Sequence, residues 1–295
     1  MAKKSPGLRR LYRIVSYPLE ALAVALIFVT FYLLPVDLSS RLGGYIVRLI
    51  GPWLAYQRRA VDSLQRAFPD LDSKEIEKIT YSMWDNLGRV LAELPHLKKI
   101  ANDRVKILNE KYLTPIKGDG TPCIFFTGHF ANWELLAFAA QKVGTPYLQV
   151  YRAANNQLVD LMLRKIRGLK DEEIIPKGPE GAKEVIKSLK AGLRLGIMVD
   201  QKMNDGIPVE LFGRKAMTAP AVAKLSMRYN CHAIPVRIIR KDGCNFELKI
   251  YDAIDKPADG NISKMMRDIN NLIEEWATED PSQWLCWLHR RWPED

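Results

Sequence analysis

From residue 123 onward, short apolar segments alternate with longer amphipathic segments, and this alternation constrains the fold more than any other feature. The segments typical of strands are residues 123–127, 147–151, 195–200, 233–240 and 246–254. The segments typical of helices are residues 131–143, 156–167, 181–190, 219–229 and 261–278. Strands joined through helices run parallel and are covered on both faces, whereas a Lys241-Asp242-Gly243 turn makes the last two strands a hairpin. The sequence predicts an α/β fold: a central, largely parallel mixed sheet flanked by helices.

Upstream of this region, residues 74–94 predict an amphipathic helix, because apolar residues recur there at spacings of three and four and Ser73 can cap it. The chain of 295 residues is 47% hydrophobic, which is enough for a sizeable core. Its four cysteines form no Cys-x-x-Cys pair and no Cys/His ligand spacing. Cys123 and Cys231 lie in or beside apolar segments, so we expect these two thiols to be buried. We also expect a reducing compartment and no metal site.

The positive charge of the chain is concentrated near its N-terminus. Residues 1–66 contain ten Lys or Arg residues against three acidic ones, which is most of the net charge of +10. This basic segment surrounds the most apolar stretch of the chain, residues 21–34. Anionic lipid headgroups attract basic residues near a membrane surface. The pattern predicts a membrane-anchoring N-terminus in contact with anionic lipids.

The apolar stretch itself is short for a membrane span. As a helix its fourteen residues cover about 21 Å, against about 30 Å of hydrocarbon core. Two arrangements stay open: a transmembrane helix, or a shallow hairpin in which residues 42–54 form a second apolar helix. No small-x-small cleavage site follows, so we expect the anchor to be retained. We divide the chain into a basic N-terminus with a hydrophobic anchor, residues 1–45, and one larger domain, residues 46–295.

The first predicted strand ends in Gly128-His129-Phe130-Ala131-Asn132-Trp133-Glu134, and a helix is predicted to follow directly. A helix N-terminus disfavours a positive charge, so we expect His129 to be neutral and able to act as a general base. If His129 lies in the turn, Glu134 can accept a hydrogen bond from its Nδ1 and orient the ring. By spacing alone, the alternative is a structural histidine beside a surface glutamate.

Residues 128–134 resemble the His-x4-Glu block of the bacterial lipid A biosynthesis acyltransferases, the lauroyl/myristoyl late acyltransferases, and of the wider glycerolipid acyltransferases. Three further blocks resemble that family in the same order: residues 151–156 with Arg167-Gly168, residues 200–201 with 209–216, and the Trp/His/Arg-rich residues 283–292. One His-x4-Glu pattern is a weak signal, but four ordered blocks that cover most of the chain are a strong one.

The resemblance implies an O-acyltransferase that moves a fatty acyl chain from acyl carrier protein to a hydroxyl of a 3-hydroxyacyl chain. The acceptor is a lipid A precursor of the Kdo-lipid IVA type, at the cytoplasmic face of the inner membrane. His129 would be the general base and Glu134 its orienting partner. Arg167 would stabilise the oxyanion or bind a sugar phosphate, and Asp200 matches an acidic position at a strand end. No cofactor is expected, because acyl carrier protein is a co-substrate.

Five further residues in or beside these blocks are predicted to bind substrate: Arg152, Asn132, Gln201, Arg214 and Lys215. Arg152 suits phosphate or phosphopantetheine, with a surface salt bridge as the alternative. Arg214 with Lys215 suits the acidic carrier protein, against the alternative of solvated surface charges. The tryptophans of residues 284–292 have two open interpretations, an interfacial belt or packing of the tail on the core.

Three other functions compete with this prediction. An exported hydrolase that uses the same base on water is disfavoured, because the sequence has neither a Gly-x-Ser-x-Gly motif nor a paired-cysteine pattern. The second is an acyl-CoA-dependent acyltransferase for another glycolipid, such as a phosphatidylinositol mannoside. The third is a non-catalytic basic protein that binds membrane or nucleic acid. Nucleic acid is disfavoured because the basic residues cluster at the anchor and no basic stripe with stacking aromatics follows.

Overall fold

The structure is a computed structural model that describes residues 6–117 and 120–292. Within these residues a seven-stranded sheet has the order β1-β9-β8-β2-β5-β3-β4. The strands are β1 (Val105–Leu108), β2 (Cys123–Thr127), β3 (Leu148–Tyr151), β4 (Ile174–Pro176), β5 (Arg194–Met198), β8 (His232–Asp242) and β9 (Asn245–Ile250). All neighbouring pairs are parallel except the antiparallel pair β8–β9. The predicted mixed, largely parallel sheet is confirmed.

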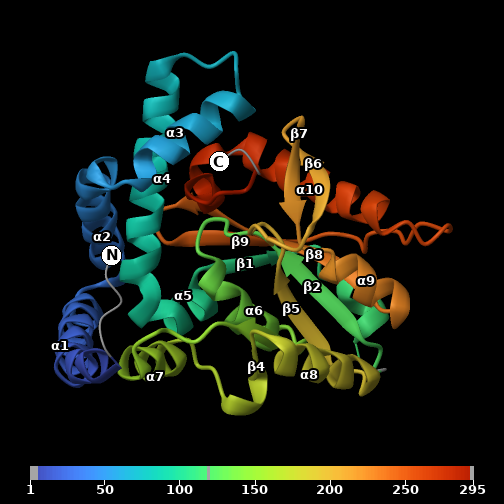
Figure 1. Cartoon of the computed structure of the whole chain (residues 1–295), viewed down its shortest axis with the longest axis horizontal. Helices are drawn as coiled ribbons and strands as arrows, with labels where there is room; N and C mark the ends of the chain where they lie inside the picture. The colour runs from blue at the N-terminus through green and yellow to red at the C-terminus, as the bar shows by residue number, and fades with distance from the viewer. Residues whose placement is uncertain (1–5, 118–119, 293–295) are drawn as a thin grey trace.

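Helices cover both faces of this sheet (Figure 1). The helices that follow the N-terminal segment along the chain are α3 (Tyr56–Ala67), α4 (Ser73–Glu93), α5 (Leu97–Asp103), α6 (Leu136–Lys142), α7 (Gln157–Ile166), α8 (Pro179–Lys190), α9 (Ala221–Arg228) and α10 (Ile262–Glu279). Strand β2 is buried along its whole length, and its successive side chains alternate between faces. Phe126 belongs to one hydrophobic cluster and Phe125 to the other, so two cores are built on opposite faces of one strand.

The predictions missed or misplaced some elements. The capping residue of α4 is Asp72, which forms a capping box with Glu75, rather than Ser73. The helix predicted over 131–143 is two shorter pieces, a 3-10 turn at Trp133–Leu135 and then α6. A second sheet, the hairpin of β6 (Ile207–Leu211) and β7 (Arg214–Thr218), was not predicted.

The N-terminal segment forms α1 (Pro6–Leu33), α2 (Val36–Ile50) and a 3-10 turn at Gly51–Trp53. In the described part of the chain, Ile14–Leu33 is long and apolar enough to cross a membrane, and most of its side chains are exposed. This agrees with the expected anchoring helix. Lys3 and Lys4, which were counted among its basic flank, lie outside the described residues.

Helix α2 lies against α4, and glycines make the contact close. A Cβ added to Gly43 would lie 2.5 Å from the carbonyl oxygen of Gly88, so only glycine fits there. The opposite side of α2 and the turn after it expose apolar side chains, namely Leu42, Tyr45, Ile46, Leu49, Ile50 and Trp53. The division of the chain at residue 45, which stays a prediction, would fall inside α2.

Candidate active site

The loop after β2 carries His129 and is shaped by its neighbours. A Cβ on Gly128 would lie 2.8 Å from a carboxylate oxygen of Asp200, so glycine is required for the close approach. Ala131 adopts a left-handed backbone conformation with φ of 44°, and its N–H donates to the carbonyl of Gln283 at 2.8 Å. Strands β2 and β5 are parallel neighbours, so His129 and Asp200 emerge at the same sheet edge.

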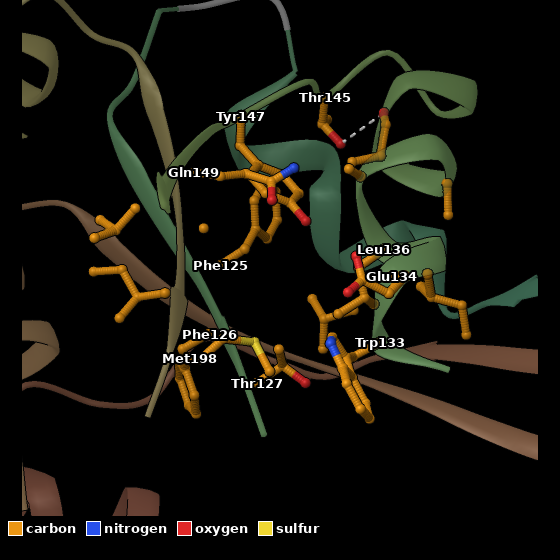
Figure 2. A pocket seen from close by; sticks show the side chains of 18 of the residues that line it. Phe125, Phe126, Thr127, Trp133, Glu134, Leu136, Thr145, Tyr147, Gln149 and Met198 are labelled. Carbon is orange, nitrogen blue, oxygen red and sulfur yellow. Dashed lines mark hydrogen bonds between the residues drawn. The ribbon is translucent and has the colours of Figure 1, made fainter. Parts of the chain in front are cut away.

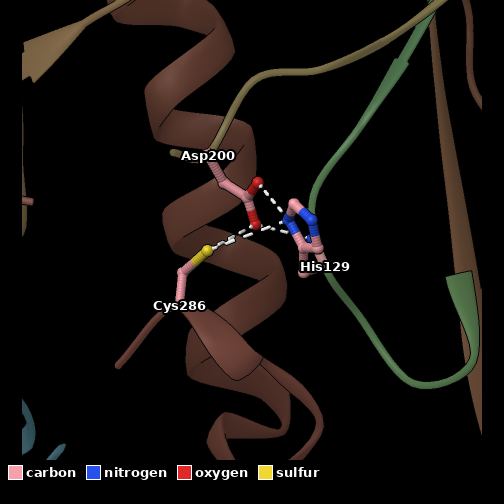
Figure 3. A group of neighbouring side chains, drawn as sticks. All are labelled: His129, Asp200 and Cys286. Carbon is pink, nitrogen blue, oxygen red and sulfur yellow. Dashed lines mark hydrogen bonds and ion pairs between the residues drawn. The ribbon is translucent and has the colours of Figure 1, made fainter. Parts of the chain in front are cut away.

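His129 and Asp200 form a doubly hydrogen-bonded pair (Figure 3). Nδ1 of His129 lies 2.8 Å from Oδ1 of Asp200, and the backbone N–H of His129 donates to Oδ2 at 2.6 Å. The indole of Trp284 and the thiol of Cys286 donate to the same Oδ2, at 2.9 and 3.1 Å. An ionised carboxylate can only accept, so His129 carries its proton on Nδ1 and Nε2 keeps a lone pair. That lone pair is the group a general base needs.

The electrostatics of the pair differ from the expectation drawn from a helix dipole. Burial lowers the pKa of His129, but the charge and hydrogen bond of Asp200, with Glu134 nearby, raise that pKa overall above its ordinary 6.5. No helix starts at His129, since the first turn begins at Trp133. The expectation that a helix N-terminus keeps the ring neutral is therefore wrong. Burial opposes ionisation of Asp200, yet the charge and hydrogen bonds of His129 hold the pKa of Asp200 well below its usual range.

Glu134 does not bond to His129. Its carboxylate forms a two-point ion pair with Arg167, with Nε to Oε2 at 2.7 Å and Nη2 to Oε1 at 2.5 Å. The 3-10 turn directs Glu134 toward the end of α7, where Arg167 follows the last helical residue. The prediction that Glu134 orients Nδ1 is therefore wrong, because Asp200 occupies that position. Burial lowers the pKa of Arg167, but Glu134 raises it overall, so the guanidinium stays charged.

The predicted substrate-binding residues fall into three groups. The amide Nε2 of Gln201 lies 3.4 Å from Nε2 of His129, and Arg152 is an exposed residue lining the neighbouring cavity. Arg214 and Lys215 lie on β7, outside that lining, and the Arg214 guanidinium lies 4.3 Å from the ring centre of Trp292. Asn132 is fully buried.

The burial of Asn132 overturns its prediction as a substrate-binding residue. Its amide Nδ2 donates to Oε2 of Glu93 at 2.7 Å, and Glu93 is itself fully buried at the end of α4. Arg240 donates to both oxygens of Glu93, and Ser40 of α2 donates to Oε1 at 2.7 Å. Asn132 therefore holds the His129 loop against a buried ion pair. Glu93 was not among the predicted site residues, because it lies in an amphipathic helix with no motif around it.

A cavity of about 280 Å³ opens beside His129. Figure 2 shows side chains that line it, with Glu134 and Trp133 on one side and Phe125, Tyr147 and Gln149 on another. Much of the lining is apolar, and it includes Phe125, Leu136, Ala139, Val143, Val236 and Leu248. Its polar groups include His129, Glu134 and Arg167. An apolar cavity with a base among its polar groups suits a hydrocarbon chain that ends in a reactive carbonyl.

The C-terminal tail packs on the core. Trp284, Trp287 and Trp292 are each at most 1% exposed, and the rings of Trp284 and Phe130 stack at 6.0 Å. This decides between the two interpretations of the tail, since none of these indoles is available for an interfacial belt. The tail thereby delivers two donors to Asp200, from Trp284 and Cys286. Neither residue was among the predicted site residues.

His129, Asp200 and Cys286 offer three ligand atoms within 4.8 Å of one another, which raises the question of a metal ion. The spacings of 2.8 Å from Nδ1 to Oδ1 and 3.1 Å from Sγ to Oδ2 are those of hydrogen bonds. Burial and the charge of Asp200 raise the pKa of the Cys286 thiol well above its ordinary value, so the sulfur keeps its proton. Metal binding needs a thiolate. The donor set fits a hydrogen-bonded site better than a metal centre.

A histidine–aspartate pair beside a largely apolar cavity, at the edge of a mixed α/β sheet, suits an enzyme that acts on acyl chains. The family model described as bacterial lipid A biosynthesis acyltransferase matches residues 6–294, and the chain belongs to this family. It is therefore an acyltransferase enzyme, which sets aside a non-catalytic binder, and its family together with α1 indicates membrane association. A comparison with curated proteins found no match.

Proposed function

We propose that this enzyme transfers a fatty acyl chain from acyl carrier protein to the hydroxyl of a 3-hydroxyacyl chain on a lipid A precursor of the Kdo-lipid IVA type. The reaction takes place at the cytoplasmic face of the inner membrane. One observation carries the proposal: His129 lines an apolar cavity with its Nδ1 proton committed to Asp200. The family supports the acceptor class, and the anchor with its basic flank supports the location.

In the proposed mechanism the acyl chain of the donor lies in the cavity with its thioester at the polar end. Nε2 of His129 removes the proton from the acceptor hydroxyl, and the oxygen attacks the thioester carbonyl. Asp200 stabilises the imidazolium that forms. The tetrahedral intermediate expels the thiolate, which takes the proton from Nε2, and the products are the new ester and the free thiol. The Gln201 amide, 3.4 Å from Nε2, lies where the acceptor hydroxyl would bind and would move aside.

Arg167 and the backbone support the developing negative charge in this proposal. The Arg167 guanidinium lines the cavity and is held in place by Glu134 at two points. The first backbone N–H groups of the turn at Trp133–Leu135 have no partner within that turn and offer further donors. Arg152, exposed and lining the same cavity, suits the phosphate of the phosphopantetheine arm. These roles give Glu134 a positioning function in place of the one predicted from spacing.

The test is mass spectrometry of a detergent-solubilised reaction with purified protein. The donors are acyl carrier protein and coenzyme A, each charged with dodecanoyl to hexadecanoyl chains. The acceptors are a Kdo-bearing tetra-acylated lipid A precursor and a phosphatidylinositol mannoside. We expect a mass gain of one acyl group on the lipid A precursor with the carrier-protein donor, abolished by His129→Ala. Transfer only from acyl-CoA to the mannoside would replace this assignment with the alternative.

A further inference from the structure

We propose that Arg59 and His289 form an anion-binding subsite beside His129, which holds a phosphate group of the acceptor lipid. The inference rests on the proposed function, because it assigns the place of the acceptor in that reaction. It concerns a side of His129 that the cavity does not reach, since neither Arg59 nor His289 lines the cavity.

His289 faces the proposed base. Its ring centre lies 6.4 Å from that of His129, with an angle of 43° between the planes. The backbone N–H of His289 donates to the carbonyl of Cys286 at 3.0 Å, which ties it to the same turn that supplies a donor to Asp200. The residue is partly exposed, so a ligand next to His129 can also contact it.

Arg59 comes from a distant part of the chain and is fixed next to His289. It lies on α3, and its Nη1 donates to the carbonyl of Leu288 at 3.0 Å. The side chain is half-buried and also lies against Tyr56, with 5.5 Å from the guanidinium carbon to the ring centre. One donor nitrogen is therefore used to hold the guanidinium, and a guanidinium has five N–H donors in all.

In the described part of the chain, neither Arg59 nor His289 forms an ion pair with a carboxylate. Other arginines do: Arg58 pairs with Asp62, Arg167 with Glu134 and Arg240 with Glu93. The nearby carboxylate of Asp200 is already bonded to His129.

The charges of His129 and Arg59 therefore influence the protonation of His289. Burial lowers the pKa of His289, and the charges of His129 and Arg59 lower it further, while Asp200 opposes them. An anion bound between Arg59 and His289 would relieve this repulsion and favour the charged imidazolium.

The position of Arg59 also suits a lipid headgroup. Helix α3 follows the turn Gly51–Trp53, where Trp53 is 89% exposed and Leu54 and Tyr56 are exposed as well. Exposed aromatic residues of this kind collect at the level of lipid headgroups. A lipid whose chains lie in the bilayer beside Trp53 would present its headgroup phosphate near Arg59.

The experiment measures the KM for the acceptor with the lipid A precursor and with the same lipid after phosphatase treatment. Arg59→Gln and His289→Gln are compared with Arg58→Gln, a matched control whose side chain is 92% exposed. We expect the two subsite variants to raise the KM for the phosphorylated acceptor about tenfold, as for loss of one charge-assisted hydrogen bond. The KM for the dephosphorylated acceptor and for the donor should not change, and Arg58→Gln should match the parent protein. An equal effect on both acceptors, or none on either, would overturn the subsite.

Two further readouts separate this inference from the proposed reaction. Binding of the phosphorylated lipid to His129→Ala protein in detergent micelles needs no turnover, so it tests the subsite even if no acyl transfer occurs. Weaker binding after adding Arg59→Gln supports the subsite, and unchanged binding contradicts it. The acceptor KM should also fall as the pH is lowered through the pKa of His289, and His289→Gln should abolish that dependence. If the acceptor KM of His289→Gln still falls as the pH is lowered, the titrating group is His129, Asp200 or the phosphate, and the role given to His289 is contradicted.

Discussion

Nδ1 of His129 lies 2.8 Å from Oδ1 of Asp200, although the two residues are 71 positions apart in the chain. They meet because β2 and β5 pair in parallel, with Thr127 opposite Met198 in the last register position before both loops. The topology of the sheet thus selects the partner of the base. Glu134, only five residues away from His129, is directed to Arg167 instead.

The pH dependence of the reaction follows from the His129–Asp200 pair. The base must be neutral, and the pKa of His129 is raised above its ordinary 6.5, so activity is lost as pH falls through that raised value. We predict that kcat/KM rises with pH and that its acid limb has a midpoint above 6.5. In Asp200→Asn, burial becomes the dominant influence, so the residual activity should have its acid limb at lower pH. An acid limb that does not move in this variant would contradict the pairing.

Because Glu134 and Arg167 form an ion pair, we predict that replacing both has a non-additive effect on the free energy of unfolding. Arg167→Gln leaves a mostly buried carboxylate with no positive partner, and we expect a loss of about 2 kcal/mol in the free energy of unfolding. Combining it with Glu134→Gln should cost less than the sum of the single changes, because the unpaired charge is then removed. Denaturant unfolding of the four proteins of this cycle measures the coupling. Additive losses would mean that the pair contributes nothing as a pair.

We predict that replacing Gly196 changes the length of acyl chain that the enzyme prefers. It lines the cavity together with Tyr147, and a Cβ at this position would lie 2.2 Å from the Tyr147 ring. Gly196→Ala should push the ring into the space of the chain. Loss of room for two methylene groups is worth about 1.6 kcal/mol, or roughly 15-fold in preference for the shorter chain.

Competition between donors of two chain lengths in one reaction measures this preference directly. Tyr147→Ala is the matched opposite change, since it removes the ring and should favour the longer chain. The same preference in Gly196→Ala, Tyr147→Ala and the parent protein would show that the acyl chain does not bind at this end of the cavity.

We predict that replacing Asn132 lowers the rate of acyl transfer without weakening substrate binding. Asn132→Ala removes the bond that ties the His129 loop to Glu93, and Arg240 and Ser40 still satisfy that carboxylate. We expect kcat to fall about tenfold, because a base displaced by a fraction of an ångström loses alignment, while both KM values stay the same. Steady-state kinetics with each substrate varied in turn provide the measurement. A rise in KM with unchanged kcat would restore Asn132 as a substrate-binding residue.

The elements with local signals could be predicted from the sequence. Strand β2 was predicted at its observed bounds because four consecutive apolar residues and Thr127 end at a glycine, and the alternation of strands and helices predicted the parallel sheet. The hairpin β6–β7 was not predicted because its strands mix charged and apolar residues, and its turn depends on positive φ angles at Phe212 and Gly213.

The site was only partly predictable for a related reason. His129, Glu134, Arg167 and Asp200 were all singled out, but which of them pair is decided by strand order and by the direction of one short turn. The same holds for Trp284 and Cys286, whose contacts with Asp200 span more than 80 residues. Glu93 carries no local signal, since its partners come from α2, from the loop after β2 and from β8.

The most direct test of the central claim is the kcat of acyl transfer in Asp200→Asn beside Glu134→Gln, each shown to be folded by circular dichroism. An amide at residue 200 can no longer stabilise the imidazolium or fix the Nδ1–H tautomer, so we predict a loss of about 10³–10⁴-fold in kcat. Glu134→Gln keeps Asp200 in place and should lose far less, about tenfold. A larger loss in Glu134→Gln than in Asp200→Asn would contradict the account, because it would make Glu134 the partner of the base.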